Sequence, residues 1–102
     1  MDQYVAASWQ VKPGLEDDFK RRWRAFTSWT LENAPGARSF TLLHNEAEPD
    51  RFISYGTWTD RESIHAWWEL EGFDMRYQSC LAVCVDHKGA EHSVAAQLTP
   101  VS

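Results

Sequence analysis

The sequence lacks the features that mark membrane proteins and nucleic-acid-binding proteins. It contains no apolar run of membrane-spanning length, and its first residues, MDQYVAAS, lack a basic stretch followed by an apolar core. Basic residues are also scarce: 10 lysines and arginines stand against 15 acidic residues, and the net charge is −5. The one basic run, KRRWRAF (20–26), follows EDD, a pattern typical of a solvated helix face with acid–base pairs. We therefore expect a soluble, cytoplasmic protein that binds no membrane and no nucleic acid.

Cysteine is nearly absent as well, which bears on disulfides and metals. The two cysteines, Cys80 and Cys84, lie four residues apart in a helical pattern, a poor setting for a strain-free disulfide. Together with His87 and His92 they offer ligand types that zinc accepts, but their spacing matches no established zinc finger. We expect reduced, buried thiols and no metal site.

Aromatic residues, in contrast, are abundant for a chain of this length. The 102 residues are 14% aromatic and include six tryptophans. Each large ring can bury about 150–250 Å², whereas a small domain leaves much of its surface uncovered when it folds alone. The composition therefore favours an oligomer, or an apolar ligand, that covers some of these rings.

Hydrophobic periodicity predicts an alternation of strands and helices. The predicted elements are a strand at 4–11, a helix at 15–33, strands at 38–46 and 51–58, a helix from 59 to about 70, a helical pattern at 73–84 that ends at HKG (87–89), and a strand at 91–98. Thr59 and Glu62 have the spacing of a capping box at the start of the second helix. The order β-α-β-β-α-β predicts an α+β, ferredoxin-like fold in one domain, 1–102, with helices on one face of a four-stranded antiparallel sheet.

A sheet covered on one face leaves its other face bare in a single subunit. Two copies that place these faces together would bury both and close a barrel. We therefore expect a homodimer.

Three stretches of the sequence resemble one family. They are VKPGLEDDFKRRW (11–23), APGARSFTLLHNEAEPDRFISYGTW (34–58) and TWTDRESIHAWWELEGF (57–73). In order and spacing they are similar to the antibiotic-biosynthesis-monooxygenase family of dimeric α+β barrels, over roughly residues 5–98. The resemblance implies the fold strongly and the chemistry weakly, because members of this family do different things.

One branch of that family oxygenates aromatic polyketides to quinones without metal, flavin or haem. Its pocket has a tryptophan at the end of the third strand, and Trp58 stands at that position. An asparagine, a tyrosine and an arginine of that pocket are replaced here by Ser54, Ile64 and Gln78. The polar part of that branch's pocket is therefore absent from this sequence, and only its tryptophan is matched.

A second branch binds and degrades haem. Its tryptophan on the helix after the third strand corresponds to Trp67, whereas its asparagine and its axial histidine are replaced by Ala7 and Tyr77. A tyrosinate can ligate ferric haem, so the resemblance leaves haem binding open and argues against haem breakdown by the same route.

The tryptophans allow two interpretations. Trp58 shares its strand face with the small residues Ser54 and Gly56, so it either lines a pocket or anchors a helix to the sheet as a core residue. Adjacent helical residues point about 100° apart, so Trp67 and Trp68 face two different surfaces, of which the core or a dimer contact accounts for at least one. We expect Trp58 and Trp67 to pack against the ring of a substrate.

Four further residues are candidates for proton transfer or for contact with the substrate. Histidine is the residue type best suited to proton transfer at neutral pH, and His65 either deprotonates a phenol or points to solvent. Tyr77 either donates a hydrogen bond to a substrate oxygen or is an ordinary aromatic of a helix stripe. We take His65 and Tyr77 as candidate catalytic residues, and Tyr55 and His44 as further substrate-binding candidates.

The function that these expectations favour is oxygenation, without a cofactor, of an aromatic or polyketide-like small molecule that forms a quinone. In such a reaction the substrate itself supplies electrons to molecular oxygen, while the protein excludes water and orients the ring. The alternatives are a non-catalytic barrel that binds a hydrophobic ligand or haem, and a dimer whose aromatic residues only pack.

Overall fold

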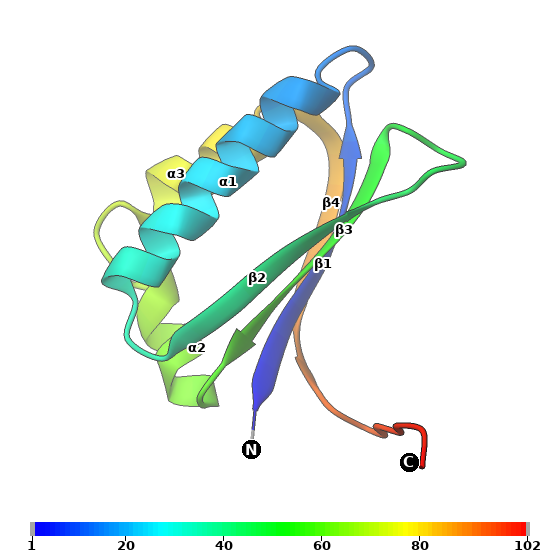
Figure 1. Cartoon of the computed structure of the whole chain (residues 1–102). Coiled ribbons are helices and arrows are strands. Elements are labelled where there is room, and N and C mark those ends of the chain that lie inside the picture. Colours follow the sequence, from blue (N-terminus) through cyan, green and yellow to red (C-terminus); the bar gives the residue numbers. More distant parts are fainter. Residues whose placement is uncertain (1, 102) are drawn as a thin grey trace.

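The protein is built on a four-stranded antiparallel sheet with the strand order β2-β3-β1-β4 (Figure 1). The structure is a computed structural model that describes residues 2–101. The elements are β1 (Gln3–Val11), α1 (Glu16–Asn33), β2 (Ala37–His44), β3 (Arg51–Trp58), α2 (Arg61–Trp68), α3 (Phe73–Leu81) and β4 (Cys84–Ser93). The first strand lies in the middle of the sheet, between β3 and β4. This arrangement confirms the predicted ferredoxin-like α+β fold.

All three helices lie on one face of the sheet, and the other face is bare (Figure 1). The long helix α1 buries Phe19, Phe26 and Thr30 on the side that faces the sheet. Its first turn carries three acidic residues, whose negative charge interacts favourably with the positive end of the helix dipole. Strand β3 presents Phe52 and Trp58 to the same core. One layer of helices on one layer of sheet therefore encloses a single-sided core.

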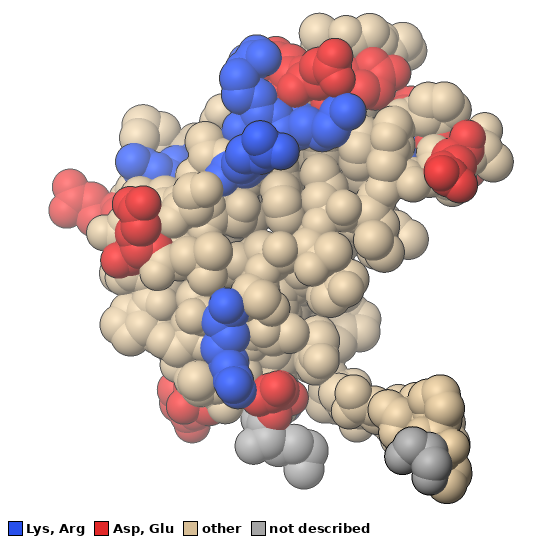
Figure 2. Space-filling model, viewed as in Figure 1, with Lys and Arg blue, Asp and Glu red and all other residues tan. Residues whose placement is uncertain are grey.

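Acidic and basic side chains lie together at the N-terminal end of α1. Figure 2 shows these groups over this end of the helix, and further charged groups toward the other edges of the molecule. The basic groups pair with acids one turn away, since Lys20 contacts Asp17 and both Arg21 and Arg22 contact Asp18. The predicted solvated helix face is thus present. Among residues 2–101, no helix has the length and apolar character needed to cross a membrane.

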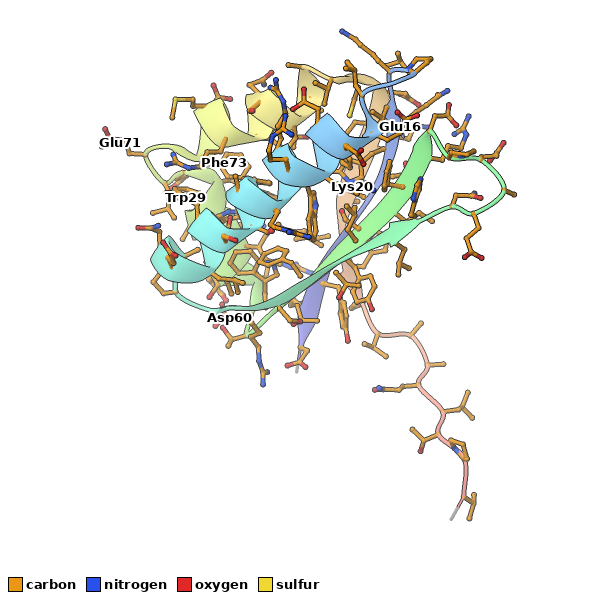
Figure 3. The ribbon with its side chains drawn as sticks, turned by 45° about the horizontal axis from the view of Figure 1, so that its top comes forward. Glu16, Lys20, Trp29, Asp60, Glu71 and Phe73 are labelled. Carbon is orange, nitrogen blue, oxygen red and sulfur yellow. The ribbon has the colours of Figure 1, made fainter. Side chains whose placement is uncertain are left out.

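Helix α2 begins one residue later than the capping-box prediction. Its N-cap is Asp60, whose side chain accepts a hydrogen bond from the Ser63 backbone N–H at 2.8 Å, where β3 gives way to the helix (Figure 3). The predicted Thr59–Glu62 box is therefore wrong. A carboxylate is a strong N-cap and sits at the positive end of the dipole, so Asp60 takes the position in preference to Thr59.

The last strand is also displaced from its predicted position. The spacing of residues 73–84 predicted a helix that ends at 87–89, but α3 ends at Leu81, and β4 spans Cys84–Ser93. The cause is long-range pairing: β1 has a free edge, and β4 pairs along it from Val11↔Cys84 to Gln3↔Ser93. Sheet pairing overrides the local helical pattern. Residues 91–93 of the strand predicted at 91–98 lie in β4, whereas residues 94–98 leave the sheet, with 99–101, as an extended tail (Figure 1).

Candidate functional site

A row of small residues crosses the sheet beneath the helices. Ala7 of β1 lies opposite Ser54 of β3 on one side and Gly89 of β4 on the other. The neighbouring row carries large rings, because Trp9 lies opposite Phe52 and His87. Helices that rest on the large rings cannot touch the small residues, and a cavity of about 330 Å³ remains between the two layers.

Aromatic side chains from all three helices form the opposite wall of this cavity. They are Trp23 and Phe26 of α1, Trp67 and Trp68 of α2, and Phe73 and Tyr77 of α3. Phe73 and Trp29, the latter outside the cavity, lie at the same end of the helical layer (Figure 3). Trp67 is held by a hydrogen bond from its Nε1 to the buried Thr30 hydroxyl at 3.0 Å. The cavity is therefore a space lined largely by rings, suited to an apolar aromatic molecule.

The polar atoms of the cavity gather where α3 faces β1 and β4. The Tyr77 hydroxyl and His87 Nε2 are 2.6 Å apart, and the His87 ring lies 4.0 Å from the Trp9 ring. Trp9 in turn donates from its Nε1 to the Ser54 hydroxyl oxygen at 2.9 Å. The polar side chains in the cavity lining are thus Tyr77, His87, Ser54 and Thr27, and the Thr27 hydroxyl is engaged with the backbone of α1.

Burial shifts the pKa values of this pair in opposite directions. Burial, aided by the nearby Cys80 thiol, raises the pKa of Tyr77. Burial lowers the pKa of His87, while the Ser8 backbone and the Asp86 carboxylate oppose that lowering. Both shifts favour neutral side chains at neutral pH. The hydrogen bond therefore joins a neutral phenol to a neutral imidazole.

Comparison with known proteins places the chain in a family. Its sequence matches the antibiotic biosynthesis monooxygenases over residues 3–74. The chain belongs to this family.

Solved structures share its fold at low identity. One is SnoaB, a cofactor-independent oxygenase from Streptomyces nogalater, at 15% identity over 97% of this chain and 98% of that chain, with a TM-score of 0.88. A second is an antibiotic biosynthesis monooxygenase, which is 19% identical over 92% of this chain and 99% of that chain, with a TM-score of 0.77. A third is a conserved protein from Methanosarcina mazei Go1, which is 16% identical over 90% of this chain and 91% of that chain, with a TM-score of 0.80. These likenesses establish the fold. No curated protein matches the chain significantly.

The predicted catalytic and substrate-binding residues lie at different depths in the structure. Trp67 and Tyr77 line the cavity with their rings. Trp58 is fully buried in the core, where its ring packs on Phe40 and Trp67, so it supports the cavity wall from behind. Tyr55 borders the cavity through its backbone, because strand alternation directs its side chain to the bare face of the sheet, near Tyr4.

The two remaining candidates lie outside the cavity lining. His65 is half exposed on α2, hydrogen-bonded to Glu91 of β4, and its ring stacks on Trp68 at the cavity edge. His44, at the end of β2, is hydrogen-bonded to the Pro49 carbonyl and stacks on Phe52. His65 therefore reaches the cavity only through Trp68, and His44 only through the core.

The cysteines are placed as reduced thiols in the protein interior. Cys80 is fully buried and the Cys84 thiol donates to the Cys80 carbonyl. Burial raises the pKa of Cys80 to about 12 and that of Cys84 to about 11, which disfavours the thiolate that a metal or an electrophile requires. Within residues 2–101, no three histidine, cysteine or acidic side chains converge as a metal site requires.

Sequence reasoning missed His87, Trp9 and Ser54 as a connected group. His87 was assigned to a helix end, which separated it from Tyr77, although the two face each other across α3 and β4. The missing signal was the register of the last strand. Once Trp9 is placed opposite His87, the next pair on the same face of the sheet is Ala7 opposite Gly89. These two small residues beside two large rings predict the hollow.

The lowered pKa of His87 predicts a pH dependence of stability. The unfolded chain binds a proton at this residue near the ordinary value of 6.5, whereas the folded chain binds it only at lower pH. The unfolded state therefore holds more protons below about pH 6.5, and the free energy of unfolding falls as the pH decreases, by at most about 1.4 kcal/mol per pH unit from this residue.

Urea unfolding at one protein concentration, repeated from neutral to acidic pH, measures this contribution. The stability difference between the native chain and His87→Gln should shrink on acidification. The matched control, His92→Gln, removes an exposed imidazole of the same strand and should not reproduce this trend. A difference for His87→Gln that stays constant with pH would contradict the assignment.

Proposed function

We propose that this chain is an oxygenase that uses molecular oxygen, without an added cofactor, on a small electron-rich aromatic molecule with an ionisable hydroxyl. The observation that supports this most is the cavity between ring-bearing helices and small sheet residues, with the hydrogen-bonded Tyr77–His87 pair in its lining. The family is named for monooxygenases, and SnoaB, which shares the fold, is a cofactor-independent oxygenase. The substrate class is our proposal, based on the apolar walls and on the Tyr77–His87 pair.

The proposed reaction converts a phenol, or the enol form of an anthrone, to a quinone. Loss of the hydroxyl proton makes the ring a strong electron donor, and molecular oxygen then bonds to the ring carbon opposite the hydroxyl. The peroxide that results takes up a proton, its O–O bond breaks, and the ring hydrogen leaves as a proton. One oxygen atom becomes the new carbonyl and the other leaves as water, so the substrate supplies all the electrons.

Each part of the cavity has a task in this proposal. Trp67 and Trp68 hold the substrate ring, and the Tyr77 hydroxyl contacts its oxygen. Trp58 keeps Trp67 in place from the core, and His65 keeps Trp68 in place at the edge. The apolar walls exclude water, which strengthens every hydrogen bond to the developing anion.

Haem binding through Tyr77 is a weaker candidate. An axial tyrosine must be deprotonated to ligate ferric haem, whereas burial raises the pKa of Tyr77 and its hydroxyl is engaged with His87. A hemin titration in which no tyrosinate absorption band develops agrees with the oxygenase proposal, and a band that is lost in Tyr77→Phe would instead favour haem.

Oxygen uptake with a hydroxyanthrone, in chelator and without flavin or reductant, tests the oxygenase. We expect one oxygen consumed per quinone formed. Replacing Trp68 with Leu removes an aromatic contact worth about 0.5–1.5 kcal/mol and should raise KM by about three- to tenfold. Trp29→Leu is the matched control, because Trp29 lies outside the cavity beside Arg76 and should leave KM unchanged. Binding of the anthrone without any oxygen uptake would reduce the chain to a ligand-binding barrel.

We further propose that two copies pack the bare faces of their sheets together. This face carries Leu43 and Ile53, both about half exposed, and the Tyr4 and Tyr55 rings. The tail exposes Val94 and Leu98 as well, which adds apolar surface that a partner would cover. An uncovered apolar surface of this kind favours association.

Sedimentation of two charge variants tests the homodimer. Ile53, 56% exposed on the bare face, is replaced by Glu, and Met75, 68% exposed on α3, is replaced by Glu as a matched control. The native chain and Met75→Glu should sediment as dimers at micromolar concentration, and Ile53→Glu as a monomer, because the interface cannot solvate a buried carboxylate. A native chain that sediments as a monomer would contradict this proposal.

A further inference from the structure

His87 is a half-buried titratable group that faces the cavity and has no established task. The Tyr77 hydroxyl is hydrogen-bonded to its Nε2, and the Trp9 ring packs against its ring. Its backbone is fixed by the pairing of β4 with β1. Its Nδ1 is buried and reaches hydrogen-bonding geometry with no residue among 2–101. An imidazole held in this way, in an apolar wall, is positioned for a purpose other than packing.

The direction of the Tyr77–His87 hydrogen bond follows from the chemistry of its two groups. The contact itself allows either direction, depending on the tautomer of the imidazole. A neutral phenol is a stronger donor than a neutral imidazole N–H, and an unprotonated imidazole nitrogen is a stronger acceptor than a phenol oxygen. The Tyr77 hydroxyl therefore donates to Nε2, and its oxygen is left as an acceptor for a group in the cavity.

We propose that Tyr77 and His87 form a proton relay in which the Tyr77 oxygen accepts the proton of the substrate hydroxyl while Tyr77 passes its own proton to His87 Nε2. This inference rests on the proposed oxygenase function and assigns its base. The O–H bond of the substrate breaks, a new O–H bond forms on Tyr77, and a new N–H bond forms on His87. Tyr77 stays neutral throughout, and the products are a phenolate and an imidazolium.

The pair returns to its neutral form later in the cycle. After oxygen has bonded to the ring carbon, the peroxide carries a negative charge and takes up a proton from water. The imidazolium gives its proton back to Tyr77 as Tyr77 releases its own proton to water, so the pair is neutral again. The O–O bond then breaks as the ring hydrogen leaves as a proton, and water is released. The imidazolium thus balances the charge of the anionic intermediates within an apolar cavity.

The groups around His87 fit a base that is free at neutral pH. Charged and titratable groups near the pair come from each packed element: Tyr77 and Cys80 from α3, Asp86 from β4, and Arg22 from α1 beside Cys80. The β1 side offers the Trp9 ring and the Ser8 backbone. The Asp86 carboxylate opposes the lowering of the His87 pKa, and so favours the imidazolium once it forms. His65, in contrast, is bonded to Glu91 outside the cavity lining.

Ionisation of a bound phenol tests the relay without any turnover. A hydroxyanthraquinone absorbs at longer wavelength when its hydroxyl is ionised, and it cannot be oxidised further by the proposed reaction. When the native chain binds the hydroxyanthraquinone, the pH at which the hydroxyl of this ligand ionises should fall. His87→Gln and Tyr77→Phe should each abolish the shift, whereas Tyr4→Phe, which removes a hydroxyl from the bare face, should retain it. A shift that persists in His87→Gln, or a native chain that binds no hydroxyanthraquinone, would overturn the relay.

The pH profile of oxygen uptake is the second measurement. General acid–base catalysis contributes about 10²–10⁴-fold, so His87→Gln should lower kcat by about 100-fold or more at neutral pH. The native kcat/KM should fall on acidification along a limb below the ordinary histidine value of 6.5, and this limb should vanish in His87→Gln. If His87→Gln keeps the native kcat and the native acidic limb of the kcat/KM profile, the relay is rejected, whereas the oxygenase proposal is unaffected. A His87-dependent ionisation shift without oxygen uptake would reject the oxygenase and leave the relay standing.

Discussion

The site depends on a packing mismatch between two adjacent rows of the sheet. The row of Trp9 and His87 holds the helices at a distance, and the row of Ser54, Ala7 and Gly89 does not fill the space this creates. Protein interiors are otherwise close-packed, so a hollow of this size is a property of the register. The same register brings the polar groups together, because the residue that lies beside Trp9 across the strands is a histidine, and Tyr77 covers it from α3.

Much of the fold could be predicted from periodicity and turn residues. The first helix and the two hairpin strands are local patterns, with alternating or three- and four-residue spacing and clear Pro and Gly boundaries, and they lie where predicted. The error fell on β4. Residues 84–93 contain charged and small side chains with weak alternation, and they form a strand because the edge of β1 requires a partner. A single-sequence pattern does not contain that requirement.

The candidate site was predictable only as far as its local parts. The doublet Trp67–Trp68 was expected to serve two surfaces, and indeed Trp67 is buried against Thr30 while Trp68 is 44% exposed at the cavity edge. Of the small residues of β3, Ser54 and Gly56 both border the hollow, but the Phe40 ring occupies the place where a side chain at Gly56 would lie. The partnership of Tyr77 with His87 could not be predicted, because it joins a helix to a strand whose position was misjudged.

The measurement that tests the central claim most directly is ligand binding to a chain whose hollow has been filled. Titration of tryptophan fluorescence with a hydroxyanthraquinone should give saturable binding to the native chain. Ala7→Leu places a larger side chain in the row of small residues and should weaken binding by at least about tenfold, which corresponds to about 1.4 kcal/mol. Its unfolding transition must remain cooperative for the comparison to hold. Equal affinity of the native chain and a folded Ala7→Leu would contradict the account, because the ligand would then lie elsewhere.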